Sequence, residues 1–399
     1  MQIHRSSSRL TFRRRRRRSG CLSLTVLLGL CLGVAAASWA WIGQRIAPAG
    51  APGPVADLGP ALQAFDRGDL DAAVNLAQQA LAADPSSAAA PVLLARALVY
   101  RSYSDYNRDI DRESALQITT EALALHPSDV DVMAAHAFAL QAARQPQAAA
   151  ELARRALDRA PDHALARVAL GLAYSGVGSH EIALRETQRA AQSTGWRLDA
   201  LRALALGYSG VGDYAAAVRT IEQALALNPR LIALHFERAA YARLIGDADA
   251  ATVAYFQILA YAPANVKARL RLCELSSTLR ERDAAVQYCQ HVTDLAPTWA
   301  EGWYRLGREY FLQGNFQLAQ QYLNRCSRLQ ALQDVPAAER RFECWYLQGQ
   351  AAEILGDCDA LVATYNEYLA IASAAGLSQT WVYPPEGPSA CATSNEPPR

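Results

Sequence analysis

The sequence predicts an all-α protein built from a repeated helical unit, and three observations lead to this prediction. Apolar residues make up 51% of the 399 residues, aromatic residues make up only 8%, and alanine is very frequent. This composition favours closely packed helices over sheet. Prolines that end apolar helical segments recur at a regular spacing, and the chain is longer than a typical single globular domain. An extended array of helices therefore fits the chain best.

Positive charge is concentrated at the start of the chain. Eight arginines, namely Arg5, Arg9 and residues 13–18, precede an apolar stretch, and no acidic residue occurs before Asp57. Without these arginines, 31 basic residues face 38 acidic ones, a balance of about −7. A body with this charge is not expected to bind nucleic acid. Lys267 is the only lysine among 39 basic residues, a bias typical of a GC-rich bacterial genome.

Residues 21–43 are predicted to form one transmembrane helix that acts as a signal anchor. Residues 21–42 carry no charge over 22 positions. As a helix they would reach about 33 Å, close to the thickness of the hydrocarbon layer. The basic tail, residues 1–20, is expected to stay cytoplasmic, and Trp39 and Trp41 suit the far interface, so the body would lie outside the cytoplasm.

The alternative for this segment is a cleaved signal peptide followed by secretion. A basic start, an apolar core and the small residues 35–37 also match that pattern. We favour the anchor because the apolar stretch continues through Trp41.

Two segments flank the predicted helical body, residues 61–375. Residues 44–60 are rich in Pro, Gly and Ala and are expected to form a semi-rigid linker. Residues 376–399 end in a stretch rich in Pro, Ser and Ala and are expected to form a disordered tail.

The body repeats with a period of 34 residues. The prolines that follow apolar segments are spaced by 42, 34, 68, 34 and 34 residues; they are Pro85, Pro127, Pro161, Pro229, Pro263 and Pro297. Each period holds two apolar segments separated by a glycine or polar turn, which predicts a helical hairpin. An eight-residue insertion falls within residues 101–114, and we favour a tolerated loop over a binding feature there.

The clearest copy of the repeat lies near residue 300. It contains Trp303, Leu306, Gly307, Tyr310, Gly314 and Ala319, and Ala331 stands where the other copies have proline. Other copies keep Gly171, Tyr174, Gly178 and Ala183, or Tyr208, Gly212, Ala217 and Ala224, or Trp345, Gly349, Gly356 and Tyr365. This pattern resembles the tetratricopeptide repeat (TPR) family. The resemblance implies a right-handed α-solenoid of about nine hairpins whose first helices line a concave groove.

No catalytic, cofactor or metal site is expected in this chain. A phosphate-binding loop needs a lysine after its glycines, but Lys267 follows Val266 with no glycine nearby. No two of the seven histidines have the helical spacing of a metal-binding pair. The repeats leave no segment long enough for a catalytic domain, so we expect neither an enzyme nor a small-molecule substrate.

Six cysteines lie beyond the apolar segment, an even number in a compartment expected to be oxidising. Cys326 and Cys344 fall on adjacent helices across a unit boundary, and Cys273 and Cys289 fall on the two helices of one hairpin. At least one of these two bridges is expected. The alternative is that cysteine replaces alanine at small buried positions.

The groove implied by the resemblance gives a set of candidate partner-binding residues. They lie on the non-packing faces of first helices and are Phe236, Lys267, Arg271, Glu274, Tyr304, Arg305, Arg308, Tyr346 and Gln350. Arginines interleaved with tyrosines suit an acidic or extended peptide, although a solvated surface is an equal alternative for any single arginine. In units three to five this face is more apolar and is expected to suit a partner helix; it contains Ala134, Phe138, Val168, Leu172 and Leu206.

These observations predict a membrane-tethered scaffold for protein–protein interaction at the extracytoplasmic face. The scaffold would bind a peptide or helix of another protein in its groove. Two alternatives are a cytoplasm-facing regulatory adaptor, which requires the arginine run to be translocated, and a non-catalytic accessory subunit of an envelope-biogenesis enzyme complex.

Overall fold

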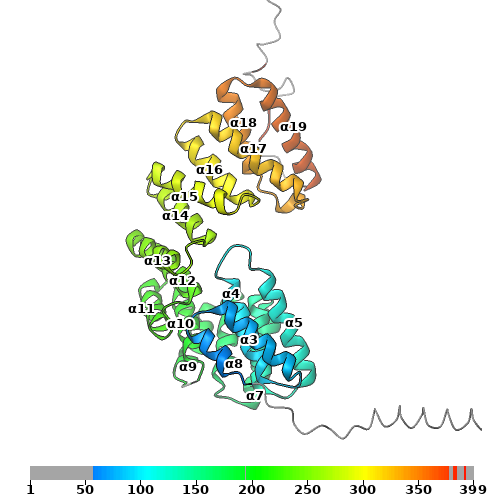
Figure 1. Cartoon of the computed structure of the whole chain (residues 1–399), viewed down its shortest axis with the longest axis vertical. Coiled ribbons are helices and arrows are strands. Elements are labelled where there is room, and N and C mark those ends of the chain that lie inside the picture. The colour runs from blue at the N-terminus through cyan, green and yellow to red at the C-terminus, as the bar shows by residue number, and fades with distance from the viewer. Residues whose placement is uncertain (1–56, 194, 377–380, 384–390, 392–399) are drawn as a thin grey trace, which may run out of the picture. The chain divides into compact units, whose positions relative to one another are not determined.

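The computed structural model describes residues 57–193, 195–376, 381–383 and 391 (Figure 1). The chain divides into two compact units, residues 1–55 and 56–399, and the described residues belong to the second. The predicted basic tail, the predicted transmembrane helix and most of the predicted linker lie outside the described residues. Within the described part, none of the helices has the length and apolar character needed to cross a membrane.

All regular secondary structure of the described residues is helical, which confirms the predicted all-α class. Nine hairpins follow one another along this part of the chain. Their first helices are α2 (Gly59–Asp66), α4 (Ala89–Ser102), α6 (Val130–Ala142), α8 (Ala164–Gly176), α10 (Arg197–Gly210), α12 (Ile232–Leu244), α14 (Val266–Thr278), α16 (Ala300–Leu312) and α18 (Glu343–Leu355). Their second helices are α3 (Leu70–Ala83), α5 (Ile110–Leu125), α7 (Pro146–Arg159), α9 (His180–Ala191), α11 (Tyr214–Leu227), α13 (Ala248–Tyr261), α15 (Arg282–Leu295), α17 (Phe316–Leu332) and α19 (Cys358–Ala374). A short 3-10 helix, η1 (Ala337–Glu339), lies between α17 and α18.

The turns inside five hairpins end in an aspartate or asparagine that caps the second helix. The carboxylates of Asp213 and Asp247, for example, accept hydrogen bonds from the backbone N–H groups of Ala216 and Ala250 and so cap α11 and α13. Apart from the connection between α4 and α5, each turn has one residue with a positive φ, which glycine accommodates without strain, as at Gly212. Most hairpins place glycine here. The turns of two hairpins, α6/α7 and α14/α15, are exceptions, with arginine in the left-handed region at φ 62° and 64°.

Small residues let the helices of a hairpin approach closely. A Cβ atom added at Gly307 of α16 would lie 2.7 Å from Cγ of Leu323 of α17, and one at Gly171 of α8 would overlap Cγ2 of Thr187 of α9. Contacts this short are not possible without movement, so only glycine fits at these positions. Neighbouring hairpins then bury apolar clusters, the largest of which runs from α2 to α12 and is rich in alanine and leucine.

The insertion between α4 and α5 is not a free loop, because it packs against α14 (Figure 1). Nζ of Lys267 donates to the carbonyl oxygen of Tyr103 at 2.7 Å, and the backbone N–H of Lys267 donates to the carboxylate of Asp105 at 3.0 Å. The rings of Tyr106 and Trp299 stack with centroids 4.3 Å apart. The segment is a connecting loop, as predicted, but it packs against the helical array instead of standing free.

Two further contacts join the first hairpins to later ones. The side-chain amide of Asn228 donates to the carbonyl oxygen of Phe65 at 2.9 Å. Arg96 of α4 donates to the buried carboxylate of Asp199 of α10 through Nε at 3.2 Å and Nη2 at 2.7 Å. The first two hairpins thus contact the fifth, and we call these contacts, with those of the insertion, the closure contacts.

Residues 381–383 and residue 391 lie in the predicted disordered tail, but they are ordered. Trp381 is 6% exposed, and a Cβ atom at Gly349 of α18 would overlap its ring. The hydroxyl of Tyr383 donates to the carboxylate of Glu353 at 2.7 Å. A tryptophan and a tyrosine give this short segment enough apolar surface to pack against the last hairpin.

Candidate functional site

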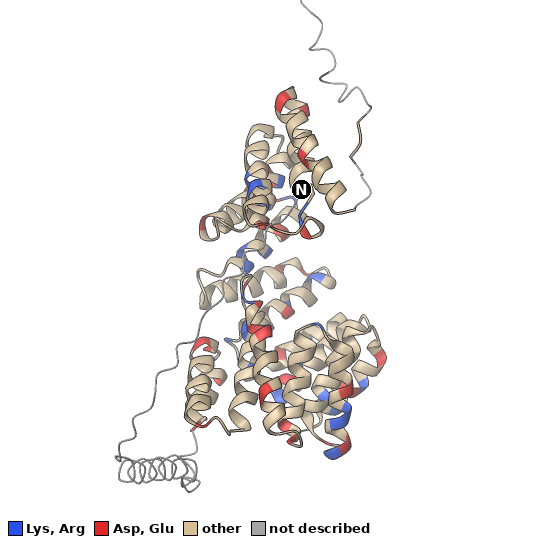
Figure 2. Cartoon of the chain, turned by 90° about the vertical axis from the view of Figure 1, so that its right-hand side faces the viewer, with Lys and Arg blue, Asp and Glu red and all other residues tan. Residues whose placement is uncertain are grey.

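A polar groove about 530 Å³ in volume lies along α14 and α16. Five of the nine residues proposed from the sequence line it, namely Arg271, Glu274, Tyr304, Arg305 and Arg308. Its other lining residues are Arg243, Cys273, Ser277, Thr278, Arg282, Glu309 and Leu312. Figure 2 shows basic segments in this middle part of the helical array. We call this site the arginine groove.

The floor of the arginine groove holds a buried carboxylate. The side chain of Glu309 is 1% exposed and accepts hydrogen bonds from Oγ of Ser277 at 2.5 Å, Nη1 of Arg308 at 3.0 Å and Nη1 of Arg282 at 3.1 Å. These bonds fix the two guanidinium groups at one end of the groove. A buried charge needs such partners, since an unpaired one is strongly destabilising.

A second carboxylate orients the arginines at the other end of the groove. Oε2 of Glu274 accepts from Nη1 of Arg271 at 2.6 Å, and its Oε1 lies 3.0 Å from Nη2 of Arg305. Arg305 also donates to Glu301 at 2.7 Å. Burial lowers the pKa of Arg305, but the attraction of Glu301 and Glu274 outweighs burial and leaves this pKa above its ordinary value. The arginine therefore carries its charge at any physiological pH.

The arginine groove is positively charged and remains open to solvent. Five arginines face two glutamates in its lining, a net charge of +3. The side chains of Arg271 and Arg308 are 41% and 37% exposed despite their internal partners. Burial, followed by the nearby charge of Glu343, raises the pKa of the Tyr304 hydroxyl, which therefore stays neutral. Guanidinium groups held in fixed orientations suit carboxylates, which they can bind with two parallel hydrogen bonds.

Lys267 contacts the insertion rather than an open groove, and Phe236 lies beside Lys267. Nζ of Lys267 lies 4.4 Å from the ring centroid of Phe236, and it donates to Tyr103 as described above. Burial, with a further contribution from Arg271, lowers the pKa of Lys267 to about 8. The insertion therefore occupies this part of the concave face.

Tyr346 and Gln350 lie apart from the arginine groove, on α18. The Gln350 side-chain amide donates to the Tyr346 hydroxyl at 2.7 Å, and the Tyr346 ring meets the edge of Trp381 at 5.7 Å. Tyr346 remains 38% exposed.

The apolar face expected to suit a partner helix in units three to five is largely buried. Phe138 is 2% exposed and Leu172 is 4% exposed, while Ala134 and Val168 have no exposed surface. These residues belong to the core of the array, so that expectation is wrong. The first helices pack directly against one another here, α6 against α4 and α8, and α8 against α10, so the apolar residues between them are covered.

The six described cysteines form three disulfides. Cys273 is joined to Cys289 and Cys326 to Cys344, with Cα–Cα distances of 5.3 Å and 6.0 Å. The third bridge joins Cys358 at the start of α19 to Cys391, with a Cα–Cα distance of 5.5 Å. The first two pairings were predicted from the sequence, and the third was not, because residue 391 lies in the segment expected to be disordered.

Three groove residues, Ser277, Arg282 and Glu309, were not predicted from the sequence. The repeat itself contains a signal for Glu309, because the positions 34 and 68 residues earlier are Leu275 and Tyr241, which are 6% and 4% exposed. A glutamate in this register of the core must find buried partners, and arginines nearby are the candidates.

Comparisons with known proteins agree with this architecture. Residues 300–331, which cover α16 and most of α17, match the tetratricopeptide repeat family model. The crystal structure of the APC/C hetero-tetramer Cut9-Hcn1 is similar in fold, with a TM-score of 0.53 and 17% identity. The match covers 78% of this chain and 59% of that one. No curated protein sequence matches the chain.

Two other solved structures cover shorter parts of the chain. The crystal structure of MamA has 16% identity and a TM-score of 0.37, and the match covers 41% of this chain and 96% of that one. The pilF protein of Pseudomonas aeruginosa has 23% identity and a TM-score of 0.37, with 51% and 92% covered.

Proposed function

We propose that this TPR-repeat protein is a membrane-tethered interaction scaffold outside the cytoplasm, and that its arginine groove binds an acidic peptide segment of a partner protein. The observation that carries the proposal is the groove itself, where five arginines face two glutamates. The TPR fold is typically non-catalytic, which fits a binding role.

The arginine side chains of the groove are preorganised for an anionic ligand. Glu309 and Glu274 hold four of the five arginines in place, so little side-chain entropy is lost when a carboxylate binds. The same two glutamates leave the net charge positive, so attraction for an acidic segment remains. Tyr304 is only 7% exposed, and the guanidinium groups of Arg305 and Arg341 lie over its ring at 5.3 Å and 4.6 Å, so it helps to hold Arg305 in place.

The proposed placement outside the cytoplasm has two supports. Residues 21–42 carry no charge and follow a run of arginines, an arrangement that orients a single anchor with its basic end in the cytoplasm. Disulfides persist in oxidising compartments and are rare in the cytosol, and three of them join the described cysteines. A cytoplasmic adaptor is harder to reconcile with these bridges.

Changing the exposed arginines of the groove should weaken binding of an acidic peptide. We expect the double variant Arg271→Ser and Arg308→Ser to bind at least tenfold less tightly, because each loses a charge-assisted hydrogen bond and tenfold corresponds to about 1.4 kcal/mol. The probe is the fluorescein-labelled peptide Gly-Ser-Tyr-Asp-Glu-Asp-Ser-Gly, measured by fluorescence anisotropy with the full chain in phosphatidylcholine nanodiscs.

The matched control is the double variant Arg189→Ser and Arg219→Ser, which removes the same charge from two exposed positions outside the groove. We expect it to bind like the unchanged chain. Equal losses in both double variants would show that only net charge matters, and this would contradict a specific groove. Failure of the unchanged chain to bind the probe would also contradict it.

Topology is tested in cells with reporters fused to the C-terminus. We expect alkaline phosphatase to be active there and a fluorescent protein to be dark, because folding of the first requires export and folding of the second requires the cytoplasm. An immunoblot against an N-terminal tag should show the full-length chain. Bright fluorescence would instead support the cytoplasmic adaptor, and loss of the tag would support secretion.

A further inference from the structure

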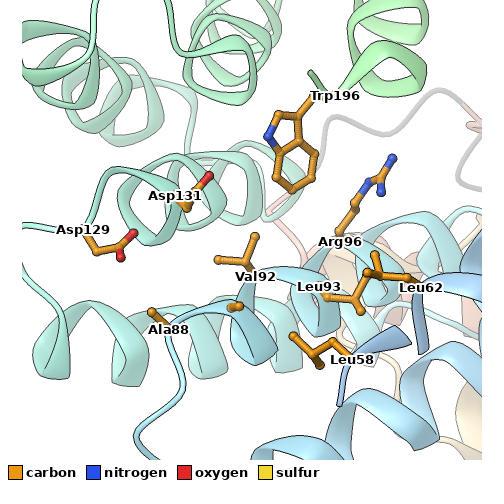
Figure 3. Close-up of a pocket in the computed structure, with 10 residues that line it drawn as sticks. Leu58, Leu62, Ala88, Val92, Leu93, Arg96, Asp129, Asp131 and Trp196 are labelled. Atoms are coloured by element: carbon orange, nitrogen blue, oxygen red, sulfur yellow. The ribbon is translucent and has the colours of Figure 1, made fainter. Parts of the chain in front are cut away.

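A second pocket, distant in sequence from the arginine groove and opposite to it in charge, lies where the first hairpins meet α10 (Figure 3). The volume of this pocket is about 290 Å³. Its lining comes from four places in the chain: α2, α4, the start of α6 and the residue before α10. The residues are Leu58 and Leu62, then Val92, Leu93 and Arg96, then Asp129 and Asp131, and finally Trp196. This volume is below that of a typical small-molecule site and suits one or two side chains.

The walls of this pocket are apolar. Val92 and Leu93 are 6% and 5% exposed and form the base, while Leu62, which is 43% exposed, forms an open edge. Trp196 stands over the base from the opposite side, as Figure 3 shows. Its backbone is left-handed at φ 53°, a conformation uncommon for a bulky residue, and it places the indole ring at the pocket.

The charges around the pocket favour a cation. Arg96 is the only basic residue in the lining, and the fully buried carboxylate of Asp199 neutralises it through two hydrogen bonds. The carboxylates of Asp129 and Asp131 remain at the other end (Figure 3). Asp129 caps α6, and Asp131, whose side chain is 59% exposed, pairs with His163 at 3.0 Å.

We propose that this pocket is a second peptide-binding site, selective for a partner segment in which an aliphatic side chain is followed by lysine or arginine. The aliphatic group enters between Leu62, Val92 and Trp196, where burial of apolar surface favours binding. The basic group then reaches Asp131. The site differs from the arginine groove in position and in preferred charge, so it extends the proposed function to a partner, or a pair of partners, with segments of both signs.

The test uses the full chain in phosphatidylcholine nanodiscs and the fluorescein-labelled peptide Gly-Ser-Leu-Leu-Arg-Arg-Ser-Gly. We expect Asp131→Asn, which keeps an acceptor for His163 but removes the charge, to weaken binding at least fivefold. Leu62→Ala should weaken it at least threefold, and the side chain is exposed enough for the fold to tolerate this change. Asp249→Asn, at an exposed position on α13, is the matched control and should bind like the unchanged chain.

Two control peptides test separately the contribution of the aliphatic side chain and that of the basic side chain. Replacing both leucines of the probe by glycine, or both arginines by serine, should each weaken binding to the unchanged chain. The variant Arg271→Ser with Arg308→Ser should bind the probe normally, so failure of the arginine groove and failure of this pocket are distinguishable. The proposal is overturned if the probe does not bind, or if Asp131→Asn and Leu62→Ala bind it as tightly as the control.

Discussion

Replacing Asp199 by alanine should destabilise the helical body by about 3–5 kcal/mol, the cost typical of removing one partner from a buried ion pair. The side chain of Asp199 is fully buried and that of Arg96 is 13% exposed. The Asp199 carboxylate also accepts a hydrogen bond from the Tyr100 hydroxyl at 3.1 Å. Burial, followed by the charge of Asp199, raises the pKa of Tyr100, so this hydroxyl stays a neutral donor. The variant leaves a buried guanidinium and a buried hydroxyl without their acceptor.

The measurement is urea unfolding of the full chain followed by circular dichroism. Asp249→Ala, at an exposed position, should change the free energy of unfolding by less than about 0.5 kcal/mol. The triple variant Arg96→Met, Tyr100→Phe and Asp199→Leu should recover most of the loss, because apolar groups of similar size then replace both the buried ion pair and the hydroxyl that depends on it. If Asp199→Ala is as stable as the control, the closure contacts do not stabilise the array.

Replacing Trp381 by alanine should cost about 3–5 kcal/mol in the last hairpin, as large aromatic truncations do in a packed core. The Trp381 ring lies over Gly349, and its centroid is 5.1 Å from that of Tyr365 and 5.2 Å from that of Tyr368. No larger residue than glycine fits under this ring, and without the ring α18 and α19 would leave a cavity.

Hydrogen exchange locates this effect. Because hairpins in a repeat array depend mainly on their neighbours, amides of α18 and α19 should lose protection while those of α6 to α9 keep it. Val382→Ala is the control, since its side chain is 66% exposed, and it should change protection little. Unchanged exchange in α18 and α19 of Trp381→Ala would show that residues 381–383 do not stabilise the hairpin.

The repeat period was enough to predict the helices but not the closure. Proline after a second helix and glycine in a turn act within a few residues, so a 34-residue period reports them wherever they occur. The contact between Lys267 and Tyr103 joins residues 164 positions apart, and no local pattern marks it. The insertion was visible as eight extra residues, yet nothing in its sequence identified α14 as the surface it contacts.

In the candidate site, too, the sequence predicted what depends on local spacing and missed what depends on long-range contacts. Helical spacing placed Arg271, Glu274, Arg305 and Arg308 on the same side of successive first helices, and the structure brings them into one groove. Glu309 was missed because the candidates were chosen only from the non-packing faces of first helices, whereas Glu309 is buried. The sequence analysis did not identify the pocket near Trp196, since its walls come from helices at both ends of the closure.

The closure contacts also bear on the order in which the array folds. A simple stack of hairpins can nucleate anywhere and grow by short-range contacts, so its mean sequence separation between contacting residues is low. The hydrogen bond from Asn228 to Phe65 spans 163 residues, and forming such a contact early would require closing a very long loop. Stacking of the hairpins between them brings these residues together without that entropic cost. The ends of this span should therefore dock last, as a final step that converts independently growing hairpins into one cooperative unit.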